Sequence, residues 1–247
     1  MLRDRVIDTA INLGIDDQIR ALRATVHPVH RKQRADDKKL RLLLQSTLTR
    51  TSNCIDIGAY RGRVLAAMVR VAPNGRHIAY EPSPRAYERL IIRFPSVDVR
   101  RAAVSNAVGE TTFTYVKGQP GRSGLQERSL SGEHRVDHIT VRQEMLDRSL
   151  PSGYIPALIK IDVEGAERQV FEGAIETICR YKPIIVFEHG KGGAPHFGTQ
   201  PSHIYELLHG QAGLDIFDMN GIGPYSLTQL EASFDLDEQW DYVARPG

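Results

Sequence analysis

The chain has 247 residues, of which 41% are apolar and 25% are charged. These proportions are typical of a globular protein and exclude general disorder. Its 32 Lys and Arg against 30 Asp and Glu give a net charge of +2, which argues against a dedicated nucleic-acid-binding protein. The two cysteines, Cys54 and Cys179, lie in apolar runs, so we expect reduced core thiols, no disulfide or zinc framework, and a cytoplasmic location.

Targeting segments are not expected. No apolar run is long enough to cross a bilayer, and the start of the chain lacks the apolar region of a secretory signal.

Residues 1–50 are expected to form an N-terminal helical extension to one domain at residues 51–247. Leu2, Val6 and Ala10 repeat at helical spacing, and Asp36 precedes a Leu-rich run that resembles a capped helix. The extension is basic, whereas residues 201–247 are acidic. We interpret both as solvated faces, with attraction between them in a homodimer left open.

From residue 53 the pattern predicts alternating strands and helices. The first expected strands are 54–58, 77–81 and 97–104, with helices around 64–71 and at 84–94. Two more strands, 111–116 and 136–141, flank a Gly-, Ser- and Arg-rich loop at Lys117–Arg135, which we predict to be a lid over an acceptor. The later expected elements are strand 157–162, helix 164–179, strand 183–188, loop 190–201, helix 204–208 and strands 214–217 and 240–243.

This alternation predicts an α/β fold with a doubly wound, mostly parallel sheet. Ligands of such sheets bind at the carboxyl ends of the strands. The residues that directly follow each strand are therefore the candidates for function.

The first strand ends in Asp56-Ile57-Gly58-Ala59-Tyr60-Arg61-Gly62. Gly58 allows a sharp turn, and we expect Gly62 to let the next helix start close to the sheet. The dinucleotide pattern G-x-G-x-x-G is absent. Asp56 suits a ligand with an amino group rather than a phosphate.

The second strand ends in Tyr80-Glu81-Pro82. An acidic side chain at this point can accept both ribose hydroxyl groups of a nucleoside. Glu81 follows Asp56 at the interval of one strand-helix-strand unit. Together these residues describe a nucleoside cofactor without a phosphate chain, and S-adenosylmethionine fits that description.

The segment Lys160-Ile161-Asp162-Val163-Glu164-Gly165-Ala166-Glu167 resembles the hallmark of FkbM-type S-adenosylmethionine-dependent methyltransferases. The segments at Asp56–Ala59 and Tyr80–Pro82 are similar to that family's cofactor motifs, and the match covers roughly residues 53–190. The resemblance implies a class I (Rossmann-like) methyltransferase fold and O-methylation of a sugar or polyketide hydroxyl. The expected cofactor-binding residues are Asp56, Gly58, Ala59, Tyr60, Gly62, Glu81, Pro82 and Ser105.

Asp162, Glu188 and His189 follow neighbouring strands, so we expect their side chains to converge. Two carboxylates and an imidazole suit Mg²⁺ or another divalent ion. Alternatively His189 is the general base for the acceptor hydroxyl, while Asp162 and Glu188 are the metal ligands. The predicted catalytic residues are His189 and Asp162. Glu164 and Glu167 are assigned to the first turn of the following helix, where acidic side chains favour the helix dipole. Reserve candidates for the base are His134, His138, His196 and His203.

The sequence thus predicts an O-methyltransferase for a small hydroxylated metabolite, with Mg²⁺ as an option and no nucleic-acid partner. A saccharide is favoured over a polyketide, because aromatic residues make up 7% of the chain and the expected lid is polar. The alternatives are an NAD(P)-dependent oxidoreductase, against which the missing glycine counts, and an RNA-associated methyltransferase that uses the basic N-terminal residues.

Overall fold

The computed structural model describes residues 28–116, 136–237 and 239–247. The chain divides between residues 46 and 47 into two units. Helix α3 (Pro28–Thr47) begins earlier than the start predicted near Asp36. The predicted helical pattern at Leu2–Leu13 and the predicted lid at Lys117–Arg135 lie outside the described residues.

The larger sheet of the second unit has seven strands in the described residues, in the order β3-β2-β1-β7-β8-β10-β9. Strands β3, β2, β1, β7 and β8 run parallel, and β10 runs antiparallel to both β8 and β9. The predicted mostly parallel sheet is therefore confirmed. Its strands are β1 (Asn53–Ile57), β2 (Ile78–Tyr80), β3 (Asp98–Arg100), β7 (Pro156–Ile161), β8 (Ile184–Glu188), β9 (Asp215–Asp218) and β10 (Asp241–Arg245).

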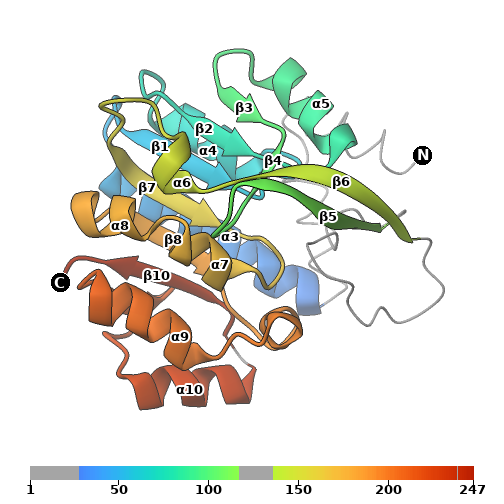
Figure 1. Ribbon diagram of the computed structural model, residues 1–247. Coiled ribbons are helices and arrows are strands. Elements are labelled where there is room, and N and C mark those ends of the chain that lie inside the picture. Colours follow the sequence, from blue (N-terminus) through green and yellow to red (C-terminus); the bar gives the residue numbers. More distant parts are fainter. Residues whose placement is uncertain (1–27, 117–135, 238) are drawn as a thin grey trace. The chain divides into compact units, whose positions relative to one another are not determined.

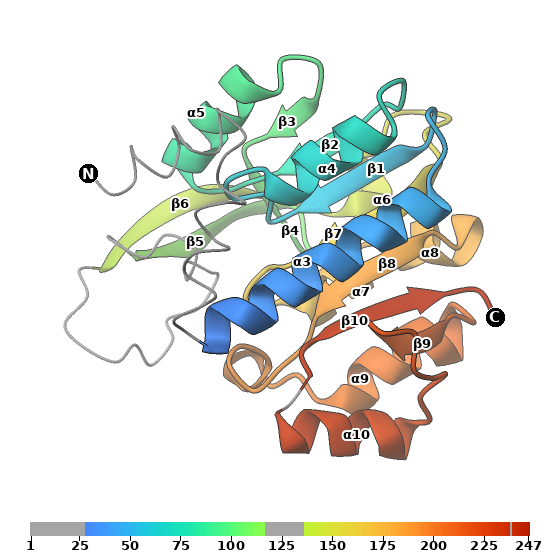
Figure 2. The same ribbon diagram turned by 180° about the vertical axis from the view of Figure 1, so that it is seen from behind.

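Helices cover both faces of this sheet (Figures 1 and 2). On one face α4 (Arg63–Val71) and α5 (Pro84–Arg93) pack through Leu65 and Leu90. On the other face α7 (Glu167–Glu172) and α8 (Ile175–Tyr181) pack through Phe171 and Ile178. Strands buried on both faces are mostly apolar in the sequence. The Cys54–Ile57 and Leu158–Ile161 segments are apolar apart from Asp56 and Lys160.

The smaller sheet has the order β4-β6-β5. Its strands are β4 (Ala102–Val104), β5 (Gly109–Val116) and β6 (Val136–Glu144). The predicted single strand at 97–104 is therefore wrong. The chain changes partner at Arg101, because Asp98–Arg100 pairs with β2 whereas Ala102–Val104 pairs with β6.

Two helical expectations need correction. The predicted helix at 164–179 is two helices, α7 and α8, separated at Gly173 and Ala174. Helix α10 (Leu227–Leu236) was not predicted, although Ser226 and Gln229 form a capping box at its start. The remaining helical segments are α6 (Leu146–Ser149), η2 (Ala194–Phe197), α9 (Pro201–Tyr205) and the π-helical η3 (Glu206–Gln211).

Membrane spans were also sought in the structure. Within residues 28–116, 136–237 and 239–247, no helix has both the length and the apolar character to cross a membrane.

Replacing Ser226 by alanine is predicted to lower the free energy of unfolding by about 1 kcal/mol. The change removes the hydroxyl oxygen that accepts the N–H of Gln229 at 3.3 Å. Thr228→Ala, on the exposed side of the same helix, is the control and should leave the free energy of unfolding almost unchanged. Urea denaturation measures both values, and equal unfolding midpoints for Ser226→Ala and wild type would contradict the prediction.

Candidate functional site

A cleft opens at the carboxyl ends of β1, β2 and β7, beside the smaller sheet. Its volume is about 670 Å³, counted to its open mouth. The cleft is lined by Ile57, Gly58, Tyr60, Tyr80, Glu81, Pro82, Ala102, Ala103, Val104, Phe113, Asp162, Val163 and Glu164.

The backbone N–H groups of the turn after β1 bind to the end of β2. Gly58 and Ala59 both donate to the carbonyl oxygen of Tyr80, at 3.0 and 3.1 Å. Tyr60 donates to Oε2 of Glu81 at 2.8 Å. Since these donors already have acceptors, the turn offers few N–H groups to a pyrophosphate. This weakens the alternative of an NAD(P)-dependent enzyme.

Two glycines of the turn permit close approaches. Gly58 has a φ of 81°, and a Cβ there would lie 1.9 Å from the carbonyl oxygen of Asp162. Gly62 has a φ of 68°, and its Cβ would lie 2.4 Å from the ring of Phe94 and 2.6 Å from Leu90. Gly62 therefore makes room for α5 and the residue after it, rather than for the sheet as predicted.

Glu81 is buried, with 5% of its surface exposed. Its Oε1 accepts the N–H of Ser83 at 2.9 Å, while Oε2 accepts that of Tyr60. Burial raises the pKa of Glu81 to about 6, and the two N–H donors lower it in part. Each carboxylate oxygen keeps acceptor capacity for a further donor.

A buried cation, Lys160 of β7, interacts with Asp56 of β1 and with Asp162, the residue after β7. Lys160 Nζ lies 2.6 Å from Oδ2 of Asp162. Burial disfavours the charge of Lys160, but the carboxylates of Asp162 and Asp56 outweigh burial and raise its pKa. Burial also disfavours the charge of Asp56 and therefore raises its pKa to about 6, although the charge of Lys160 opposes that rise. Asp56 is thus buried outside the cleft lining, and its charge interacts with that of Lys160.

The loop after β7 is held in an unusual backbone shape. Glu164 has a φ of 63°, in the left-handed region that is uncommon for residues other than glycine. Glu167, the first residue of α7, accepts the N–H groups of Val163 and Gly165 at 3.3 and 3.0 Å. Burial raises the pKa of Glu167 to about 7. The prediction that Glu164 lies in the first helical turn is wrong, because α7 begins at Glu167 and Glu164 has a left-handed φ. Glu164 instead lines the cleft.

The same loop meets the loop after β8 through backbone atoms. A Cβ on Gly165 would lie 2.5 Å from the carbonyl group of Gly193, and a Cβ on Gly193 would lie 2.8 Å from Gly165. The two loops therefore touch without any side chain between them.

Glu188 is the last residue of β8 and His189 follows it, and neither lines the cleft. Burial raises the pKa of Glu188 well above its usual value, and the charges of Asp162 and Glu164 add to the rise. The ring of His189 is fully buried and stacks on Phe234 of α10, with 4.9 Å between ring centroids. Burial lowers the pKa of His189 to about 4, so the ring is neutral at neutral pH. Its role as a general base stays a prediction.

The predicted metal site is not supported. In the part of the chain that the structure describes, no three His, Cys, Asp or Glu side chains are grouped as metal ligands. Asp162 is already paired with the ammonium group of Lys160, and His189 is enclosed beside Phe234. These residues do not fit Mg²⁺, which requires oxygen ligands free to approach at short distance.

The predicted site residues divide into two groups. Those that line the cleft are Gly58, Tyr60, Glu81, Pro82 and Asp162. Those that lie outside the cleft-lining set are Asp56, Ala59, Gly62, Ser105, Glu188 and His189. Ser105 is buried after β4, where its N–H donates to the carbonyl oxygen of Glu144 at 2.8 Å.

Sequence analysis missed one wall of the cleft, which comes from the smaller sheet. Ala102, Ala103 and Val104 of β4 and Phe113 of β5 line it. The sequence does carry a signal for this wall. The apolar run that ends at Val104 is the next strand end along the chain after Tyr80-Glu81-Pro82, and the other candidates were also found at strand ends. The reserve histidines His138, His196 and His203 do not line the cleft, and His134 lies outside the described residues.

The methyltransferase FkbM domain family matches residues 56–214 of the chain. Among solved structures, the chain is similar to the methyltransferase FkbM from Methylobacillus flagellatus KT, with 14% identity and a TM-score of 0.52. That alignment covers 80% of this chain and 44% of the other, so this chain spans less than half of that structure's length.

Two further structures are similar at lower TM-scores. A TehB-like SAM-dependent methyltransferase from Corynebacterium glutamicum ATCC 13032 Kitasato has 13% identity and a TM-score of 0.44, with 83% of this chain and 85% of the other covered. The plantazolicin methyltransferase BpumL in complex with SAH has 12% identity and a TM-score of 0.43, with 98% and 97% covered. A comparison with curated proteins gives no match.

Gly58→Ala is predicted to destabilise the fold more than Gly153→Ala. Both glycines have a left-handed φ, 81° and 71°, but a Cβ at Gly153 has nothing within 4 Å. Gly153→Ala should therefore cost only the backbone strain, about 1–2 kcal/mol. Gly58→Ala adds the clash with the carbonyl oxygen of Asp162. Equal losses in thermal unfolding would show that the close approach at Gly58 is unimportant.

Proposed function

The chain belongs to the FkbM methyltransferase family, and we propose that it transfers a methyl group from S-adenosylmethionine to a hydroxyl oxygen of a small metabolite, a saccharide or a polyketide. Its fold is that of the class I methyltransferases. The observation that carries the proposal is the pairing of the β1 turn with Glu81, which leaves a carboxylate rather than free N–H groups facing the cleft.

The cleft suits a nucleoside. Glu81 can accept the two ribose hydroxyl groups, because each of its oxygens retains a lone pair. Pro82, Ala103 and the ring of Phe113 offer apolar surface to a purine. This assignment extends the predicted cofactor set to the smaller sheet.

The opposite wall is acidic. Asp162 and Glu164 line it, and carboxylates attract a ligand that carries positive charge. S-adenosylmethionine supplies a methyl group on a positively charged sulfur and also carries an ammonium group. The sequence predicts Asp56 as the partner of the ammonium group, but Asp56 is buried outside the cleft lining, so we assign this attraction to Asp162 and Glu164.

The acceptor hydroxyl must lose its proton when it attacks the methyl carbon. Of the two predicted catalytic residues, Asp162 reaches the cleft, so we assign the proton to its carboxylate. The ammonium group of Lys160, 2.6 Å from Oδ2 of Asp162, holds this carboxylate in place. The geometry of the cleft then aligns the two substrates.

The proposal is tested by incubating the protein with methyl-labelled S-adenosylmethionine and panels of sugars and polyketide precursors, followed by mass measurement. We expect label in an acceptor of one class, and we expect EDTA to leave the rate unchanged because Asp162 is held by Lys160 rather than by a metal. Loss of activity in EDTA with recovery in Mg²⁺ would restore the metal hypothesis. Binding of a nicotinamide cofactor without binding of S-adenosylmethionine would contradict the function.

The affinity for S-adenosylmethionine is predicted to fall as the pH is lowered through about 6. Burial raises the pKa of Glu81 to about 6, and protonation below that pH removes an acceptor that the ribose hydroxyl groups need. Glu81→Gln should bind the cofactor about tenfold or more weakly at neutral pH and should show little pH dependence. Calorimetric titrations across this range measure both effects. If Glu81→Gln keeps the wild-type pH dependence, another group is responsible.

A further inference from the structure

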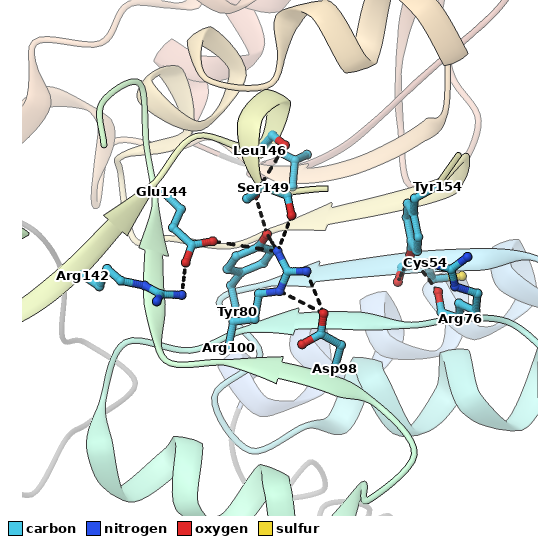
Figure 3. A network of polar contacts seen from close by, with 10 residues as sticks. All are labelled: Cys54, Arg76, Tyr80, Asp98, Arg100, Arg142, Glu144, Leu146, Ser149 and Tyr154. Carbon is cyan, nitrogen blue, oxygen red and sulfur yellow. Dashed lines mark hydrogen bonds and ion pairs between the residues drawn. The ribbon is translucent and has the colours of Figure 1, made fainter. Parts of the chain in front are cut away.

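Tyr80 stands at the junction of the cleft and a buried polar network (Figure 3). Its backbone carbonyl accepts the N–H groups of Gly58 and Ala59. Its side chain is fully buried, and its hydroxyl lies 2.8 Å from Oγ of Ser149 and 2.8 Å from Nη1 of Arg100. Tyr80 thus binds the β1 turn through its backbone carbonyl, while the hydrogen bonds of its side-chain hydroxyl fix the residue itself in place.

Hydrogen-bond directions in this network are set by its outer members. Ser149 donates its hydroxyl to the carbonyl oxygen of Leu146 at 3.4 Å. The Tyr80 hydroxyl therefore donates to Ser149 and accepts from the guanidinium group of Arg100, which can only donate.

The half-buried side chain of Arg100 contacts residues of β2, β3 and α6. Its Nε and Nη2 donate to Oδ2 of Asp98 at 3.0 and 2.7 Å, and Nη1 also donates to the carbonyl oxygen of Ser149 at 2.8 Å. The guanidinium carbon lies 5.4 Å from the centre of the Tyr80 ring. The backbone carbonyl of Arg100 accepts the N–H of Glu81 at 3.0 Å.

We infer that Arg100 is a positioning residue for cofactor binding, acting through Tyr80 on the β1 turn and on Glu81. The inference rests on the proposed binding of S-adenosylmethionine in the cleft. Arg100 itself lies outside the cleft-lining residues. When its side chain is removed, Tyr80 loses the donor to its hydroxyl, and the strand end that presents Glu81 is less firmly held. The cofactor must then order the site on binding, which weakens affinity.

The opposite end of the sheet offers a matched control (Figure 3). There the guanidinium carbon of Arg76 lies 5.6 Å from the centre of the Tyr154 ring. The buried Tyr154 hydroxyl lies 3.1 and 2.8 Å from the carbonyl oxygens of Cys54 and Arg76. Tyr154 is buried like Tyr80, whereas Arg76 is exposed and Arg100 is half-buried. Neither Tyr154 nor Arg76 lines the cleft.

The test compares Arg100→Met and Tyr80→Phe with Arg76→Met and Tyr154→Phe, by calorimetric titration with S-adenosylmethionine and by thermal unfolding. We expect Arg100→Met to raise the Kd about tenfold, with KM for the cofactor raised and kcat at saturating cofactor near the wild-type value. Tyr80→Phe should change the Kd in the same direction. Tyr154→Phe should lower Tm, because it removes a buried hydroxyl that has two carbonyl acceptors, and both control variants should keep the wild-type Kd.

Arg100→Lys keeps a charged donor and should bind the cofactor with a Kd between those of wild type and Arg100→Met. An unchanged Kd in Tyr80→Phe and Arg100→Lys overturns the inference, even if Arg100→Met fails to fold. Equal increases of Kd in all four cleft and control variants overturn it too, because they indicate general destabilisation. Wild-type protein that does not bind S-adenosylmethionine contradicts the proposed function itself, and the inference with it.

Discussion

The N–H groups of Gly58, Ala59 and Tyr60 find their acceptors at one place, the end of β2. A buried N–H group without an acceptor costs about 1–3 kcal/mol, so the turn after β1 and the segment Tyr80–Glu81 depend on each other. This dependence fixes the shape of the cleft before any ligand binds. It also gives Glu81 two tasks, since the carboxylate that we assign to the ribose is already an acceptor for the backbone.

Electrostatics of the opposite wall follow from a single buried cation. Lys160 is stabilised by the carboxylates of Asp162 and Asp56, and Glu164 adds a further carboxyl group to the same wall. A chain with almost no net charge therefore has a locally acidic cleft wall. In the sequence, the acidic residues after β7 and β8 have the pattern of metal ligands. In the structure, β7 supplies its own cation two residues earlier, and this is a physical reason why the metal prediction lacks support.

Much of the fold could be predicted, because the strand-turn-helix pattern around Gly58 and Glu81 depends on residues close together in the sequence. The division of the predicted strand at Arg101 could not, because pairing of Ala102–Val104 with the distant β6 decides it. The position of His189 depends in turn on Phe234 of α10, a helix that we did not predict although Ser226 begins a capping box. The cofactor roles assigned to the cleft residues remain proposals.

The order of strands at the far edge of the sheet has a consequence for how the protein is made. β9 precedes β10 in the sequence, yet β9 is joined to the sheet only through β10, which pairs with β8 on its other side. During synthesis, β9 therefore leaves the ribosome with no strand to pair with, while β8 presents an open edge. Until Asp241–Arg245 emerges, both edges are exposed to pairing with other chains. Strand β10 thus completes the sheet by pairing with both β8 and β9. Nascent chains in which β10 has not yet formed expose two unpaired strand edges, the kind of surface that chaperones protect.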